Sequence, residues 1–295
     1  MEQIGYLFAG QGAQFSGMGK KLSEASPAAR QVFATADKVL GYSISRLCFE
    51  GTTEELTPCA VCQPAIFTVS MACRAAWLEA GNPPPAACGG LSLGEFAAAC
   101  AAGVFSFETA LALVAERGRL MDACCQSNPG GMAAVIAGKP EEIEQICADC
   151  GIDVANYNCP GQIVISGEHE RLDRAVELLA PKCLRAVKLT VAGAYHSRLM
   201  TPAAEEFGKV LAKVNIQPPQ TIFVQNVVGE AVSNPDQIRE NLQKQVASSV
   251  RWESCARNIM NHCQRTAEFG PGTVLTGFMK RIDRTFLATP AFTEL

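Results

Sequence analysis

The chain contains 295 residues, of which 48% are hydrophobic and 18% are charged, a composition typical of a globular protein rather than a disordered or fibrous one. At roughly 150 residues per domain, this length predicts two domains, or one large domain with an insertion. The formal net charge of -4 provides no strong basic field for nucleic acid or an anionic membrane. We find no apolar run of bilayer length and no basic signal-peptide flank at the start, so we predict a cytoplasmic protein that contacts neither nucleic acid nor membrane.

Predicted strands and helices alternate along most of the chain. The apolar segment Ile4–Phe8 predicts a strand, and the glycine-rich turn Gly10–Gln14 follows at its carboxyl end, where ligands bind in α/β folds. Ser26-Pro27 and Gly41 bracket a predicted helix, and a second helix is predicted over Gln63–Ala80. Further strands are predicted near 86–90, 221–227 and 266–269. This alternation favours a parallel sheet with helical crossovers.

The segment between residues 127 and 196 breaks this rhythm. Its pattern predicts a β-α-β-β-α-β order, with elements at 132–137, 140–150, 152–156, 162–166, 168–180 and 184–191. The turn-forming sequence Asn158-Cys159-Pro160-Gly161 joins the two central strands. This order is ferredoxin-like. We therefore predict a small ferredoxin-like subdomain over 127–196, inserted into a larger α/β core formed by 1–126 and 197–295.

Fourteen cysteines are spread along the chain and include the CxxC pairs Cys59–Cys62 and Cys147–Cys150. A CxxC pair can indicate a zinc site or a redox site. Neither pair, however, has a neighbouring basic residue that would lower a thiol pKa, and nothing in the sequence indicates that the two pairs meet. We predict reduced, buried cysteines that pack like Ala or Ser, and no metal site.

The main chemical signal is Gly90-Leu91-Ser92-Leu93-Gly94, a GxSxG sequence between a predicted strand and an Ala-rich helix predicted over 93–102. The two glycines permit a sharp strand-to-helix turn that exposes the serine hydroxyl, and the next backbone N–H points toward the place where an oxyanion forms. Glycine and serine also form ordinary turns, so the pattern gains its meaning from the strand before it and the helix after it. We predict that Ser92 is a nucleophile.

A serine nucleophile needs a general base, and the chain has three histidines. His169 lies between two glutamates at a predicted helix start, which indicates a solvated face. His262 lies near the carboxyl end of a predicted helix, where it suits the helix dipole. His196 follows the last strand of the predicted subdomain, and Ser197 can cap the next helix. The dipole at a helix N-terminus favours the neutral imidazole that a base needs, so we predict that His196 activates Ser92.

The helix predicted over Phe107–Cys124 carries an arginine close to its buried side. Arg117 lies at the edge of the apolar stripe, whereas Arg119 is rotated by roughly 200° and reaches solvent. An arginine that faces a core is costly unless it pairs with an anion. Two interpretations are open. One is a structural salt bridge, for example to Glu95 or near Glu116, and the other is a fork that binds a substrate carboxylate in a bidentate manner.

Short motifs follow one another over nearly the whole chain. They lie at 8–14 (FAGQGAQ), 92–95 (SLGE), 116–118 (ERG), 131–134 (GMAA), 193–197 (GAYHS), 225–227 (QNV), 250–252 (VRW) and 268–272 (EFGPG). In these motifs and their order the chain resembles the malonyl-CoA:acyl-carrier-protein transacylases and the related acyltransferase domains of polyketide synthases. The resemblance implies an α/β-hydrolase-like parallel-sheet core that is interrupted by the ferredoxin-like subdomain.

The resemblance also implies a ping-pong acyl transfer. Ser92, activated by His196, is expected to attack malonyl-CoA, and the malonyl group of the resulting serine ester is expected to pass to the phosphopantetheine thiol of an acyl carrier protein. Such a reaction supplies extender units for fatty acid or polyketide synthesis. A thiolate leaves readily and one thioester replaces another, so no metal or redox cofactor is expected. We also predict a monomer.

Supporting roles are implied for further residues. The backbone N–H groups of Gln11 and Leu93 are expected to form the oxyanion hole, and Arg117 is expected to bind the malonyl carboxylate. Gln245 matches the position whose backbone carbonyl orients the imidazole. The residues expected to line the acyl pocket are Met121, Tyr195 and Asn158.

Two positions depart from the common family pattern. Leu91 stands where many members carry His, and Tyr195 stands where Phe is usual, but neither change removes a group from the mechanism.

The alternative enzyme is an acyl hydrolase that acts on thioesters bound to acyl carrier protein. A carboxylate clamp such as Arg117 is costly for plain acyl chains and argues against it. A catalytically silent docking subunit would not need Ser92 and His196 together.

Overall fold

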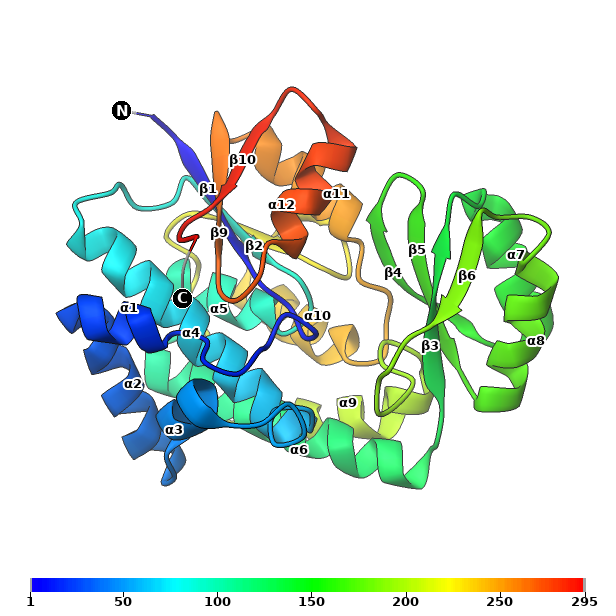
Figure 1. The fold of residues 1–295 in the computed structure, drawn as a ribbon, viewed down its shortest axis with the longest axis horizontal. Helices are drawn as coiled ribbons and strands as arrows, with labels where there is room; N and C mark the ends of the chain where they lie inside the picture. The colour runs from blue at the N-terminus through cyan, green and yellow to red at the C-terminus, as the bar shows by residue number, and fades with distance from the viewer. Residues whose placement is uncertain (1, 294–295) are drawn as a thin grey trace.

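The computed structural model describes residues 2–293 and contains two separate sheets (Figure 1). The larger sheet has the strand order β10 (Leu287–Pro290), β9 (Arg265–Phe269), β1 (Ile4–Phe8), β2 (Ala87–Gly90), β7 (Ile222–Gln225) and β8 (Glu230–Ala231). Its neighbouring strands pair in parallel except for β7 and β8, which pair antiparallel. The sequence prediction of an α/β protein with a parallel sheet is therefore confirmed.

Side chains alternate between the two faces along the central strand β1, and all of them are buried, so both faces of the larger sheet are apolar. Helices cover both faces. Tyr6 and Phe8 point to one face, where their rings pack against Phe269 at centroid distances of 4.4 and 5.5 Å. Leu7 points to the other face and packs in a separate cluster with Trp252. The core on the first face includes buried residues of α1 (Lys20–Ala25), α2 (Pro27–Leu40), α3 (Ile44–Glu50), α4 (Cys59–Glu79), α5 (Gly94–Ala101), α6 (Phe107–Ser127), α9 (Thr201–Leu211) and α10 (Pro235–Gln245), and of these α4, α5 and α10 pack directly on the strands. The second face is covered by α11 (Trp252–Met260) and α12 (Val274–Ile282).

Helix α4 begins four residues before the start predicted at Gln63. The carboxylate of Asp122, on α6, accepts hydrogen bonds from the backbone N–H groups of Cys59 at 2.9 Å and Ala60 at 2.8 Å. These bonds satisfy two of the donors that a helix N-terminus leaves open. The cap comes from a residue far away in the sequence, so the local pattern could not reveal it, and the Cys59–Cys62 pair becomes the first turn of the helix.

The same helix corrects the prediction that no apolar segment is long enough to span a bilayer. By length and composition α4 could cross a membrane, with a mean hydropathy of 1.3 in its most apolar 18-residue window. Of that window, 78% is buried inside the protein, where α4 packs between α2 and α6. Central helices of globular cores pass the same test, and the burial of α4 matches that class.

The smaller sheet is antiparallel and has its own core (Figure 1). Its elements follow one another as β3 (Gly131–Ile136), α7 (Pro140–Cys150), β4 (Asp153–Cys159), β5 (Gln162–Gly167), α8 (His169–Leu179) and β6 (Arg185–Lys188), and the strand order is β4-β5-β3-β6. Helices α7 and α8 pack on one face, where Ile143, Ile165 and Leu172 are buried. Two predicted bounds are wrong. Strand β6 is shorter than 184–191, and β4 continues to Cys159, since Cys159 pairs with Gln162 across a two-residue turn.

The two sheets meet beside β4. Val250, in the loop that follows α10, donates its N–H to the carbonyl of Ala155 at 2.8 Å and accepts at its carbonyl from the N–H of Tyr157 at 2.9 Å. The loop thereby extends the edge of the small sheet for one residue. This contact joins the small sheet to the segment that begins with Gln245.

Candidate active site

The turn around Ser92 connects β2 to α5 and depends on its two glycines. A Cβ atom on Gly90 would lie 2.1 Å from the carbonyl oxygen of Gly94, and one on Gly94 would lie 2.2 Å from the carbonyl oxygen of Phe8. Both distances are far below van der Waals contact, so only glycine lets α5 begin directly against β1 and β2. The spacing of the GxSxG sequence therefore follows from backbone packing.

Ser92 itself adopts a positive φ of 54°, which is rare for a residue with a side chain. Its N–H donates to Asn226 Oδ1 at 2.7 Å, and its carbonyl accepts from Gln245 Nε2 at 2.8 Å. Asn226 also donates from Nδ2 to the carbonyl of Gly90 at 2.8 Å. These contacts hold the turn in a strained conformation, and such strain is common at functional sites.

His196 is in hydrogen-bond contact with Ser92. Its Nε2 lies 2.8 Å from Ser92 Oγ, and its Nδ1 lies 2.8 Å from the carbonyl oxygen of Gln245. A carbonyl only accepts, so the proton lies on Nδ1 and the Nε2 lone pair faces the serine hydroxyl. Burial, and to a smaller extent the charge of Arg117, together lower the pKa of His196 to about 4. The imidazole is therefore neutral near pH 7 and available as a base.

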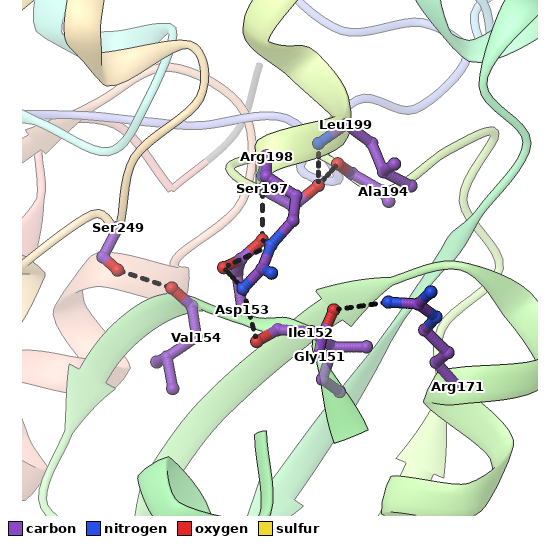
Figure 2. Close-up of polar contacts among 10 residues, drawn as sticks. All are labelled: Gly151, Ile152, Asp153, Val154, Arg171, Ala194, Ser197, Arg198, Leu199 and Ser249. Atoms are coloured by element: carbon purple, nitrogen blue, oxygen red, sulfur yellow. Dashed lines mark hydrogen bonds and ion pairs between the residues drawn. The ribbon is translucent and has the colours of Figure 1, made fainter. Parts of the chain in front are cut away.

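Strand β4 contacts both the segment that follows His196 and the loop that follows α10, at Arg198 and Ser249 (Figure 2). The Asp153 carboxylate accepts from the backbone N–H of Arg198 at 2.8 Å and forms an ion pair with the Arg198 guanidinium at 2.7 Å. On the loop that follows α10, Ser249 Oγ donates to the carbonyl of Val154, the residue after Asp153. The small sheet thus fixes the segment that carries His196 relative to the segment that carries its carbonyl partner.

Arg117 projects from α6 into the same site and is 1% exposed. Its Nη1 donates to Gln63 Oε1 at 2.7 Å, and its Nη2 donates to Ser92 Oγ at 3.0 Å and to Gln245 Oε1 at 2.9 Å. Every one of these partners is uncharged. Burial is the main reason that the pKa of Arg117 falls to about 10.

The two interpretations of Arg117 can now be compared. Within residues 2–293, no carboxylate lies within 4.0 Å of the guanidinium, and Glu116 instead pairs with Arg119 at 2.6 Å. The structure therefore gives no support to a structural salt bridge. The Nε–H group of Arg117 is buried without a partner. A buried cation without an anion, beside a serine hydroxyl, is suited to bind an anionic group of a substrate.

The two backbone donors predicted for an oxyanion hole are not occupied by other parts of the protein. Along the described chain, neither Gln11 nor Leu93 donates its backbone N–H to a protein acceptor. The side chain of Gln11 accepts at Oε1 from Gln63 Nε2 at 3.3 Å. Because Gln63 also accepts from Arg117, one glutamine ties the Gln11 loop to the arginine.

The predicted pocket residues differ in their placement. Met121 accepts at Sδ from Gln63 Nε2 at 3.4 Å, and the buried Tyr195 hydroxyl accepts from the Cys59 thiol at 3.0 Å. Both therefore belong to the network around Arg117. Asn158 lies on β4 instead of in the predicted turn, and its buried Oδ1 has no hydrogen-bond partner among the described atoms. Nothing in the hydrogen-bond network of residues 2–293 links Asn158 to the serine.

The structure adds residues that sequence reasoning missed. Cys59 was interpreted as packing, but its sulfur also contacts Gln11 Nε2 at 3.4 Å, and a hydrogen bond from Cys62 is the first cause that lowers its pKa. All fourteen cysteines are free thiols. Gln63 and Glu95 are completely buried polar residues in apolar helices. A polar residue within an apolar helix was the only feature of the sequence that could have marked them as part of the site. Their partners come from other elements, so their roles required the tertiary structure.

Comparisons with known proteins identify the family of this chain. A family model described as the acyl transferase domain matches residues 5–277. The malonyl CoA-acyl carrier protein transacylase of Bacillus subtilis (strain 168) is 39% identical over 291 residues, which cover 96% of this chain and 92% of that protein. The acyl-carrier-protein S-malonyltransferase of Bartonella henselae has a crystal structure with a TM-score of 0.95 and 38% identity, covering 99% of this chain and 96% of that one.

A third similar protein is a malonyl-transacylase whose structure is a complex with a type II PKS acyl-carrier protein. It is 36% identical with a TM-score of 0.93, and the match covers 97% of this chain and 94% of that one. The sequence matches and the structural matches thus extend over nearly the whole chain, including the serine turn and the histidine loop. The chain belongs to the acyl transferase domain family.

Proposed function

We propose that this protein transfers a malonyl group from malonyl-CoA to the phosphopantetheine thiol of an acyl carrier protein. The observation that carries the proposal is the contact between Ser92, His196 and a buried Arg117 that lacks an anionic partner. The named relatives are malonyl transacylases, and one of them is bound to an acyl-carrier protein. Hydrolysis of acyl groups is not favoured, because a plain acyl chain would leave the charge of Arg117 uncompensated.

In the first half-reaction, Ser92 Oγ attacks the thioester carbonyl while its proton moves to His196 Nε2. The charge on the former carbonyl oxygen is stabilised by the backbone N–H groups of Gln11 and Leu93, and one such donor is typically worth about 3 to 4 kcal/mol. Collapse of the tetrahedral intermediate breaks the C–S bond, and the CoA thiolate takes the proton from His196. The product is a malonyl-serine ester and free CoA.

Arg117 provides selectivity for the malonyl group. Its unpaired Nε–H and its charge attract the free carboxylate of malonyl, which a plain acyl group lacks. The charge of Arg117 is also one of the two causes that lower the pKa of His196. A bound carboxylate offsets that charge, so binding of the correct substrate makes His196 a stronger base.

In the second half-reaction, the phosphopantetheine thiol loses its proton to His196 and attacks the malonyl-serine ester; the ester C–O bond breaks, and Ser92 Oγ takes the proton back from His196. The carbonyl of Gln245 keeps the imidazole in the tautomer that both steps need. We infer that no metal or redox cofactor takes part, because one thioester is exchanged for another without net oxidation. The product serves fatty acid or polyketide synthesis.

We infer a matching division of the chain. The core formed by 1–126 and 197–295 is α/β-hydrolase-like, which is supported by the parallel sheet with the nucleophile at the carboxyl end of β2. The subdomain over 127–196 is ferredoxin-like, which is supported by its β-α-β-β-α-β order and its strand order β4-β5-β3-β6. The monomeric state, the cytoplasmic location and the role of Asn158 in the pocket stay predictions.

Intact-mass measurement after brief exposure to malonyl-CoA tests the proposal. We expect a single malonyl adduct on the wild-type protein and none on Ser92→Ala. Adding acyl carrier protein with its phosphopantetheine arm then separates transfer from hydrolysis. Movement of the malonyl group to the carrier thiol supports the proposal, whereas release of free malonate supports a hydrolase, and absence of any adduct refutes both.

A further inference from the structure

A second buried charge lies below the serine turn, and the mechanism above does not use it. Glu95 is completely buried in the first turn of α5. Its Oε1 accepts from Gln225 Nε2 at 3.0 Å, and its Oε2 accepts from the N–H of Asn226 at 3.0 Å and from Gln245 Nε2 at 2.9 Å. All three partners are donors. This environment therefore fits an ionised carboxylate, which only accepts hydrogen bonds.

The carboxamide of Gln245 lies between this carboxylate and Arg117. Its Nε2 donates to Glu95, and its Oε1 accepts from Arg117 Nη2 at 2.9 Å. Neither charge has an oppositely charged group within 4.0 Å in the part of the chain that the structure describes. The amide dipole thus joins a buried anion to a buried cation, with each end facing the charge that it stabilises.

We propose that Glu95 is a positioning residue for the transfer reaction, which fixes the orientation of the Gln245 carboxamide and thereby places Arg117 and the Ser92 turn. The inference rests on the proposed function. Glu95 does not touch the nucleophile or the site of the substrate. It acts through the carboxamide of Gln245, whose Nε2 also donates to the carbonyl of Ser92 at 2.8 Å.

The physical reason is that an amide has two different ends. If the Gln245 carboxamide rotated by 180°, its NH₂ group would face the Arg117 guanidinium, and its oxygen would face the carbonyl of Ser92. Both contacts would be repulsive. Arg117 would lose the acceptor that holds its Nη2 group beside Ser92 Oγ. The Glu95 carboxylate prevents this rotation, because it accepts a hydrogen bond and has none to donate.

Protonation of Glu95 removes this restriction. Burial raises the pKa of Glu95 to about 7, although its hydrogen bonds and the charge of Arg117 act in the opposite direction. The groups that face Glu95 are the cation of Arg117 from α6, the thiol of Cys255 from α11, and the neutral amides of β7 and α10. A protonated carboxyl donates one hydrogen bond, and rotation of the Gln245 carboxamide, which contacts Glu95 at 2.9 Å, would provide an acceptor for it.

The test compares Glu95→Gln with the matched control Glu268→Gln. Glu268 is also a buried glutamate with a pKa raised by burial, and it accepts from the N–H groups of Leu275 and Thr276 at 3.0 and 2.7 Å, away from the serine. The acylation rate with malonyl-CoA is followed by quenched intact-mass measurement between pH 5 and 9, and folding is followed by circular dichroism.

We expect Glu95→Gln to acylate about 10- to 150-fold more slowly at pH 8, the range that corresponds to one hydrogen bond to a charged group. The wild-type rate is expected to fall as the pH drops through about 7, and Glu95→Gln is expected to lack that step. Glu268→Gln is expected to retain both the rate and the step.

Three results would overturn the inference. They are a wild-type rate in Glu95→Gln, a loss of activity that only follows its unfolded fraction, and a pH step that persists in this variant. If Glu95→Gln does not fold, the wild-type profile decides, because the absence of a step near pH 7 in folded protein refutes the role. Failure of the wild-type protein to form any adduct refutes the proposed function, whereas normal acylation of Glu95→Gln refutes only this inference.

Discussion

Replacing Arg117 by Ala is expected to remove the preference for malonyl over acetyl groups. Burial lowers the pKa of Arg117 from 12.5 to about 10. At about 1.4 kcal/mol per pKa unit, keeping this guanidinium charged costs the empty site about 3 kcal/mol. A malonyl carboxylate that neutralises the charge regains a free energy of this order, and an acetyl group does not. The expected preference is therefore about 100- to 300-fold in kcat/KM.

The assay is a competition. Wild-type protein and Arg117→Ala are each mixed with malonyl-CoA and acetyl-CoA together, and the two serine esters are separated by their masses. We expect malonyl ester on the wild-type protein. On Arg117→Ala we expect malonyl transfer to fall about 100-fold or more, while acetyl transfer stays the same or rises because the uncompensated charge is gone.

Arg119→Ala is the matched control, because Arg119 lies on the same helix but is exposed and pairs with Glu116. It is expected to retain the wild-type preference. An equal loss of malonyl and acetyl transfer in Arg117→Ala would refute the reasoning. It would mean that the guanidinium mainly holds Ser92, Gln63 and Gln245 in place.

Three further predictions concern stability, each measured by urea unfolding. The folded-state pKa of His196 is lowered from 6.5 to about 4, so its contribution to stability is complete above pH 6.5 and is lost by about 3 kcal/mol as the pH falls to 4. His196→Asn should show a smaller loss than wild type over that window, and an identical loss would contradict the lowered pKa. Gly94→Ala should lower the free energy of unfolding by about 3 kcal/mol, because its Cβ would lie 2.2 Å from the carbonyl oxygen of Phe8. A neutral result would show that α5 can shift. Tyr195→Phe should cost about 1 kcal/mol by removing the acceptor of the Cys59 thiol, and no cost would mean that this contact is replaced by another.

Features with local causes were predictable from the sequence. The GxSxG pattern is visible within five residues, and Gly90 is needed because the backbone of Gly94 leaves no room for a Cβ, whereas the need for glycine at 94 comes from the distant carbonyl of Phe8. The order of the elements in the small sheet was also readable, since its strands and helices are short and separated by turn-forming residues. Element ends were less predictable. Helix α4 begins early because Asp122 caps it from α6, and β4 runs longer because β5 pairs with it to Cys159.

The environment of Arg117 had to come from the tertiary structure. Its position on the edge of an apolar stripe left both a salt bridge and a substrate clamp open, because a stripe gives the direction of a side chain but not its partners. Those partners come from α4, the serine turn and the end of α10, which are far apart in the chain. The same reason hid the role of Glu95, whose three donors come from the end of β7, from Asn226 directly after it and from α10.

By itself the sequence determined which chemical groups are present, a serine in a tight turn, a histidine before a helix and an arginine facing inward, because each depends on near neighbours. Only the tertiary structure decided their charge states and contacts. Burial and long-range hydrogen bonds make the imidazole neutral, leave the guanidinium without an anion and connect it through Gln245 to a second buried charge. These properties depend on the dielectric environment and on distances between segments, and both exist only after the chain has folded.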